Sequence, residues 1–220
     1  MSEKKLTVMV SSTVYGIEEL LERIYVLFTA FGYDVLMSHK GTVQSYSNRS
    51  TFEDCLEAVA ACDIFVSLIT PQYGSGRLGR EISITHQELL KAIELGKPRW
   101  VLAHDHVVFA RNLLLGLRHR RPESGLADPV ELKRADLSLK KGTKVMDDLR
   151  VLDLYEAAIR QELPQEQRKG NWVQKFLDDS DALLYATAQF SRYQEVEKFI
   201  TENFGDIDAV AKRLNPKGGE

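Results

Sequence analysis

Short apolar runs alternate with amphipathic stretches along the first half of the chain. Four runs have the length and composition of core strands, at residues 6–10, 33–37, 63–70 and 99–103. In three stretches between them, residues 16–32, 50–59 and 84–95, apolar side chains return every three or four positions, the spacing of one helix face. Strands that alternate with helices in this way form a parallel sheet through right-handed crossovers. The pattern predicts an open, doubly wound α/β sheet of the flavodoxin-like kind.

Local signals support this assignment. Residues 63–70, DIFVSLIT, are almost continuously apolar, as in a central strand buried on both faces. Ser50 and Glu53 have the spacing of a capping box, which predicts that a helix begins there. Gly32 and Gly96 follow the first and third helical stretches and are natural stops.

After His104 the alternation breaks. Residues 106–117 are strongly apolar and are followed by the basic, turn-rich segment RHRRPESG. We expect a helix over 145–163, a fifth strand within 169–176, and closing helices at 181–189 and 194–204. The predicted organisation is therefore a core at 1–104, a helical insertion at 105–165, a completing strand and helices at 166–214, and a frayed tail at 215–220.

Composition narrows the setting. Net charge is −3 and hydrophobic residues make up 44% of the chain, so we expect a real core and no global attraction to nucleic acid or membrane. Cys55 and Cys62 are seven residues apart, about 10 Å along a helix, which favours two buried reduced thiols over a disulfide. No stretch resembles a signal peptide or a membrane span, so we expect a cytoplasmic protein.

Polar side chains gather where the predicted strands end. Parallel sheets bind ligands at the carboxyl ends of their strands, near the point where strand order reverses. The residues expected at this edge are Ser11, Ser12, Thr13, Tyr15, Ser38, His39, Thr70, Gln72, Tyr73, Gly74 and His104. Their hydroxyl groups, backbone N–H groups and aromatic rings suit a phosphorylated sugar or a nucleotide. The alternative is that the Ser-Ser-Thr sequence only caps the first helix.

Further polar residues belong to the same prediction. Arg77 and Arg80 follow in a glycine-rich loop and could hold phosphate oxygens or be ordinary solvated charges. Ser83, at the start of the next helix, is included among the substrate-binding residues. Asp63, which begins a strand, is more typical of a turn or cap.

Glu88 is the candidate with the most distinctive position. It shares a helical stripe with Ile84, Ala92 and Leu95, so its carboxyl group has to be paired or has to line a pocket. The alternative is a second capping box, because Thr85 and Glu88 have the required spacing. Sequence alone leaves both open.

Several function classes lack their motifs. The chain has no Walker A, GxGxxG or GxSxG sequence, which argues against a P-loop NTPase, a Rossmann dehydrogenase and an α/β-hydrolase. Its five histidines show no metal spacing and CxxC is absent, so we expect no metal.

Three segments carry a resemblance to a known family. VMVSSTVYGIEELLERI, AACDIFVSLITPQYGS and EISITHQELLKAIELGKPRWVLA occur in this order, and WVQKFLDDSDALL resembles the family's closing strand and helix. The family is a domain of unknown function found at the N-terminus of many NTPase and repeat-containing signalling proteins. It is similar to Toll/interleukin-1 receptor (TIR) domains and nucleoside deoxyribosyltransferases.

This resemblance implies a function. In those relatives a glutamate on a helix faces the sugar in N-glycosidic bond chemistry, and Glu88 matches it by position. It implies an effector, in antiviral defence or signalling, that cleaves NAD or a related nucleotide. The nucleotide would be substrate or ligand, with no cofactor. Ser11, Ser12 and Thr13 would hold its phosphate or ribose, and Tyr73 would stack on its base.

Two other functions stay open. The apolar run at 107–117, with four leucines in five residues at 113–117, favours a non-catalytic nucleotide-sensing module that forms oligomers or binds a partner through 105–165. Nucleic-acid binding is less favoured, because the basic residues of the insertion are not interleaved with aromatic ones. Those residues are Arg118, Arg120, Arg121, Lys133, Arg134, Lys140 and Lys141.

Overall fold

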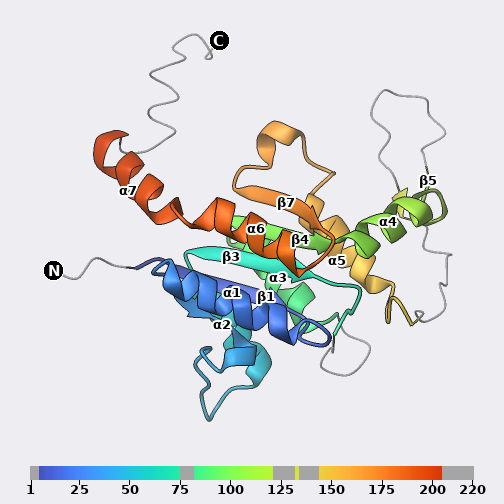
Figure 1. Cartoon of the computed structure of the whole chain (residues 1–220). Coiled ribbons are helices and arrows are strands. Elements are labelled where there is room, and N and C mark those ends of the chain that lie inside the picture. The colour runs from blue at the N-terminus through green and yellow to red at the C-terminus, as the bar shows by residue number, and fades with distance from the viewer. Residues whose placement is uncertain (1–4, 75–81, 121–131, 134–143, 205–220) are drawn as a thin grey trace, which may run out of the picture.

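A five-stranded parallel sheet organises the molecule (Figure 1). The computed structural model describes residues 5–74, 82–120, 132–133 and 144–204. The strands of this sheet are β1 (Thr7–Ser12), β2 (Asp34–Leu36), β3 (Ile64–Ile69), β4 (Arg99–His104) and β7 (Asn171–Phe176). Their order is β2-β1-β3-β4-β7, so the direction of winding reverses between β1 and β3. The predicted flavodoxin-like open sheet is confirmed.

Helices cover both faces of this sheet. The helices are α1 (Glu18–Ala30), α2 (Thr51–Ala61), α3 (Ile84–Glu94), α4 (Asp105–Arg118), α5 (Arg150–Ile159), α6 (Asp179–Phe190) and α7 (Tyr193–Phe204). Buried side chains of α1 and α6 pack together on one face, and those of α2, α3, α4 and α5 share the core on the other. Short 3-10 turns lie at η1 (Ser38–Lys40) and η2 (Gln165–Gln167), and β5 (His119–Arg120) pairs antiparallel with β6 (Leu132–Lys133).

Strand pleating sorts the side chains of β1 between the two cores. Val8 and Val10 lie in the core beneath α1 and α6, whereas Met9 lies in the core beneath α2 and α3. Ser11 is two positions after Met9 and therefore points to the α2 and α3 side as well. The first strand thus places a polar side chain in the layer between the sheet and the helices α2 and α3.

Several local predictions are confirmed. Ser50 and Glu53 form the complete capping box at the start of α2. Asp63, predicted to be a turn or cap residue, accepts a hydrogen bond from the backbone N–H of Thr7 at 2.8 Å. Cys55 and Cys62 are free and buried. Among the described helices, none combines the length and apolar character that crossing a membrane requires.

The helix predicted over 145–163 is shorter than expected. α5 covers Arg150–Ile159, and Arg160 ends it with φ 48°, a left-handed conformation. At the other end, the Asp148 carboxylate accepts the backbone N–H of Arg150 at 2.9 Å. Residues 144–149 therefore form an irregular segment ahead of the helix, in which Asp147 and Asp148 are available for contacts with other elements.

Candidate functional site

Ser11 and Glu88 meet between the sheet and the helix layer. The Ser11 hydroxyl donates a hydrogen bond of 2.5 Å to Glu88 Oε2. Both side chains are buried, with 2% of Ser11 and 4% of Glu88 exposed. The carboxyl group of Glu88 thus lies against the carboxyl end of β1, beside the point where strand order reverses.

α3 presents Glu88 to the sheet from its second turn. The N-cap of α3 is Ser83, whose side chain accepts the backbone N–H of His86. The alternative capping box built on Thr85 is therefore wrong, because the helix begins earlier and the Glu88 side chain is bonded to Ser11. The buried face of α3 also includes Thr85, Leu89 and Ala92.

Burial dominates the electrostatics of Glu88. Removal from water raises its pKa from 4.5 to about 7, against hydrogen bonds from Ser11 and Cys55 that lower the pKa. The Cys55 thiol belongs to α2, and burial, followed by the charge of Glu88, raises its pKa to about 12. Glu88 therefore changes protonation near neutral pH, in a position to take part in acid–base or charge-stabilising chemistry.

Ser67 extends this polar cluster and is not among the predicted site residues. It pairs in register with Ser11 on the neighbouring strand, so the two side chains face the same layer. Ser67 is fully buried, and within the part of the chain that the structure describes its hydroxyl has no hydrogen-bond partner. The signal in the sequence was a single serine inside the apolar run DIFVSLIT. A free hydroxyl beside Ser11 is available to a ligand or to water.

The loops after β1 and β3 touch each other. Ser12 donates to the backbone oxygen of Leu68 at 3.0 Å, and Thr13 is buried. Gly74 has φ 80°, and a Cβ atom there would lie 2.8 Å from Thr13 Oγ1. The alternative, in which the Ser-Ser-Thr sequence caps the first helix, is not found, because the N-cap of α1 is Ile17, which makes no side-chain cap.

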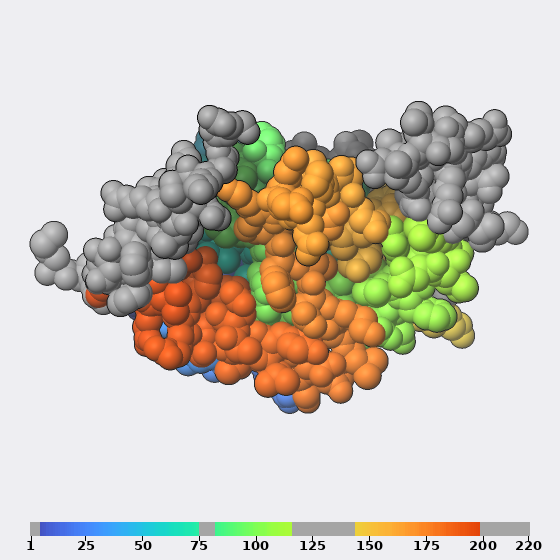
Figure 2. Space-filling model, turned by 90° about the horizontal axis from the view of Figure 1, so that it is seen from above, coloured from blue at the N-terminus to red at the C-terminus, as the bar shows by residue number. Residues whose placement is uncertain are grey.

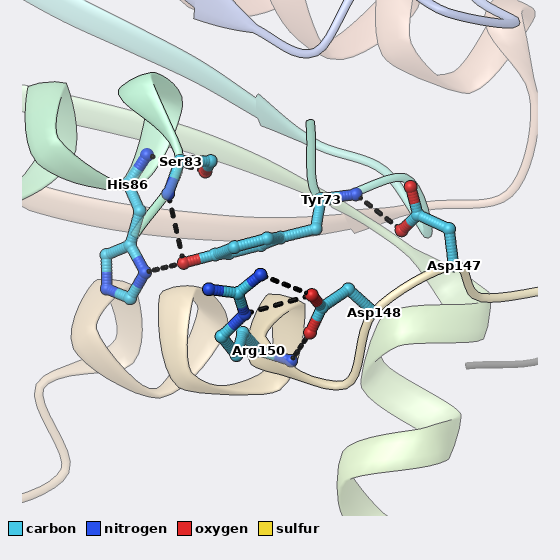
Figure 3. Close-up of polar contacts among 6 residues, drawn as sticks. All are labelled: Tyr73, Ser83, His86, Asp147, Asp148 and Arg150. Carbon is cyan, nitrogen blue, oxygen red and sulfur yellow. Dashed lines mark hydrogen bonds and ion pairs between the residues drawn. The ribbon is translucent and has the colours of Figure 1, made fainter. Parts of the chain in front are cut away.

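Tyr73 is the hub of a second polar cluster (Figure 3). Its hydroxyl lies 2.9 Å from His86 Nδ1 and accepts the backbone N–H of Ser83 at 3.2 Å. Its backbone N–H donates to Asp147 at 2.8 Å, and the Arg150 guanidinium lies 4.8 Å from the ring centroid. Only 1% of Tyr73 is exposed, so stacking of this ring on a nucleotide base does not fit the structure.

The other predicted residues are more dispersed. Thr70 is buried and its hydroxyl accepts the Gln72 N–H at 3.3 Å, which shapes the loop after β3. His104 ends β4, and burial, followed by the charge of His106, lowers its pKa. Ser38 and His39 are exposed on η1, and Tyr15 is 70% exposed. Arg77 and Arg80, and the side chains of the basic set in the insertion, lie outside the described residues.

A separate cavity lies at the opposite end of the strands. It has a volume of about 230 Å³ and is lined by residues near the amino ends of β3, β4 and β7, among them Arg99, Trp100, Asn171 and Trp172. Figure 2 shows this hollow between the orange segment before β7 and the red helices α6 and α7. None of the predicted site residues lines it. Among the described residues, no group of three or more acidic, histidine or cysteine side chains could hold a metal ion.

Comparisons with known proteins find a match to one family model and distant structural similarities. Residues 7–114, just under half of the chain, match the family described as "Domain of unknown function (DUF4062)". No curated protein matches. The TIR domains of the activated Roq1 resistosome, which directly recognises the pathogen effector XopQ, match with 14% identity and a TM-score of 0.37, over 52% of this chain and 75% of theirs. The Clostridium botulinum CMP N-glycosidase BcmB matches with 11% identity and a TM-score of 0.40, over 83% and 98%. The function of this chain is therefore to be inferred from its own residues.

Proposed function

We propose that the chain cleaves the N-glycosidic bond of NAD or a related nucleotide, with Glu88 as the catalytic carboxylate. One observation carries the proposal. The carboxyl group of Glu88 is held by Ser11 at the carboxyl end of β1, where sheets of this topology bind nucleotides. Its pKa, raised to about 7, is that of a group tuned for chemistry at neutral pH.

The chemistry suits this carboxyl group. Loss of a base from ribose passes through an oxocarbenium-like transition state, and an ionised carboxylate stabilises or traps the positive charge. Low-dielectric surroundings strengthen that interaction. Ser11 holds the carboxyl group in place, and Ser67, in register beside Ser11, offers a second hydroxyl for the sugar.

The remaining parts of the site would bind the substrate. Ser12 and Thr13, together with Gly74 from the neighbouring loop, would surround the phosphate or ribose. Ser38 and Arg77 retain the binding role implied by the sequence. Because Ser11, Thr13 and Glu88 are all buried, binding requires α3 or an adjacent loop to move.

Nucleotide cleavage by the purified protein tests the proposal. NAD and nucleoside monophosphates are incubated with the protein, and free nicotinamide or free base is separated by chromatography. Glu88→Gln should lower the rate by about 100-fold or more, because it removes the charge that faces the transition state. Glu94→Gln, on the exposed face of the same helix, is the matched control and should retain the rate. Equal rates in the Glu88 variant and the original protein would remove Glu88 from the mechanism.

A second candidate function is assembly through α4. Phe109 and Leu113 are one helical turn apart, and 63% and 67% of their side chains are exposed. Val107, on another side of the helix, is fully buried in the core. Two large apolar side chains on one exposed stripe favour an interface with a second copy of the chain.

A further inference from the structure

The buried state of Glu88 implies a controlled opening. A nucleotide has to reach a carboxyl group of which 4% is exposed and a serine of which 2% is exposed. Both lie between the sheet and the layer of α2 and α3, and α3 carries Glu88 itself. The contacts that hold the first turn of α3 in place therefore bear on how readily the proposed site opens.

Tyr73 supplies those contacts at the first turn. Its hydroxyl accepts the backbone N–H of Ser83, the N-cap of α3, and also lies in hydrogen-bond distance of His86 Nδ1. Glu88 follows His86 by two positions on the same helix. The next residue after Tyr73 is Gly74, which lies directly against Thr13. One side chain and its loop thus connect the start of α3 with the loop after β1.

The segment ahead of α5 fixes Tyr73 in turn. Asp147 accepts the Tyr73 backbone N–H at 2.8 Å, and Arg150 lies over the ring. The Arg150 guanidinium is itself held by Asp148, with hydrogen bonds of 2.9 and 2.6 Å. In Figure 3 Asp147 lies at the backbone end of Tyr73, away from Ser83 and His86, and Arg150 lies along the ring. They come from the 144–149 segment and the first residue of α5, more than 70 residues after Tyr73.

We propose that residues 147–150 are a latch that holds Tyr73, and through it α3, over the Glu88 site. Asp147 and Arg150 are positioning residues, since both contact Tyr73, and Tyr73 contacts the first turn of the helix that carries Glu88. Displacement of this segment frees the Tyr73 backbone and ring, loosens the first turn of α3 and admits the nucleotide. The proposal rests on the proposed function for its biological meaning, but the latch itself can be measured without turnover.

The reactivity of the thiols of Cys55 and Cys62 measures the opening of the site. Cys55 contacts Glu88, whereas Cys62 caps the far end of α2, near the amino end of β3. Both thiols are buried. The alkylation rate of each by iodoacetamide is followed by peptide mass spectrometry in the full chain. Opening of the site exposes Cys55 alone, and global unfolding exposes both.

Asp147→Ala should raise the alkylation rate of Cys55 about tenfold and leave Cys62 unchanged, because it removes the acceptor of a part-buried N–H. Asp147→Asn retains an acceptor oxygen and should restore the original rate. Tyr73→Phe, which loses the hydroxyl that holds Ser83 and His86, should behave like Asp147→Ala. Lys144→Ala, an exposed change in the same segment, should have no effect.

The outcomes separate the latch from the proposed activity. Unchanged Cys55 alkylation in both Asp147→Ala and Tyr73→Phe overturns the latch, as does an equal rise at Cys55 and Cys62. If Cys55 alone becomes reactive, the latch stands. Faster NAD cleavage by Asp147→Ala then supports the proposed function, whereas a reactive Cys55 with no cleavage of any nucleotide counts against that function alone.

Discussion

Ionisation of Glu88 lowers the free energy of unfolding of the chain. Its pKa in the folded state is about 7, above the ordinary value of 4.5, because the buried carboxyl group holds its proton more tightly than the same group in water. Below pH 4.5 both folded and unfolded chains carry the proton. Between pH 4.5 and 7 the unfolded chain has lost this proton, whereas the folded chain still holds it. The free energy of unfolding therefore falls as pH rises through this range.

Glu88→Gln should therefore gain stability relative to the original protein as pH rises. The glutamine keeps an oxygen for the Ser11 hydrogen bond and carries no charge. The free energies of unfolding of the two proteins should be close at pH 5 and differ by on the order of a few kcal/mol in favour of the variant at pH 8. Urea denaturation at both pH values measures this. A difference that does not change between pH 5 and pH 8 would show that Glu88 does not titrate in this range.

For individual site residues, the sequence predicted where in the fold they lie better than what their side chains do. Glu88 could be singled out because a carboxylate on a buried helical stripe is costly without a partner. Its partner Ser11 was in the predicted set, but the bond between them depends on how α3 packs on β1. Tyr73 was expected to face a ligand and instead is buried. Its partners Asp147 and Arg150 lie in and directly after an irregular segment, and no local sequence pattern indicates the conformation of that segment.

Individual elements follow local chemistry closely where caps are explicit. The capping box of α2 satisfies two backbone N–H groups through Ser50 and Glu53. By contrast, the helix predicted at 145–163 is shorter at both ends in the structure, where it covers Arg150–Ile159. Asp148 bonds the backbone of Arg150, and Arg160 adopts a left-handed conformation. The spacing of apolar residues identified the helix, but contacts with other residues set its ends, and apolar spacing does not predict those contacts.

Ser50→Ala should lower the free energy of unfolding by about 1 kcal/mol, because the backbone N–H of Glu53 loses its side-chain acceptor. Chemical denaturation of the variant and the original protein gives the value. Ser47→Ala, an exposed change in the preceding turn, should stay within about 0.5 kcal/mol of the original. A Ser50 variant as stable as the Ser47 control would mean that water caps the helix equally well.

Assembly is a property of the whole molecule. If α4 is an interface, the mass measured by light scattering should exceed 25.0 kDa and rise with protein concentration. Phe109→Ser with Leu113→Ser should return the protein to a monomer, because both apolar side chains are exposed on one stripe. Leu184→Ser, equally exposed on α6, is the matched control. A strict monomer at all concentrations, with or without NAD, would count against assembly.

The order of the sheet was predictable because four strands and the three helices between them alternate without interruption. The fifth strand was harder to place, because it arrives only after the insertion. Trp172 and Val173 marked it in the sequence, yet nothing local indicated that it pairs with β4 rather than with β2 at the opposite edge. Long-range pairing of this kind is decided by the packing of complete layers.

The pairing of β4 with β7 also has a consequence during synthesis on the ribosome. Arg99 of β4 lies opposite Asn171 of β7. The ribosome therefore has to add the 71 residues between them before it reaches Asn171. Throughout that interval β4, with the sequence RWVLAH, is an open edge of a nascent sheet, the kind of edge that other chains can join. Translation speed across the insertion therefore sets how long each newly made molecule stays vulnerable to aggregation.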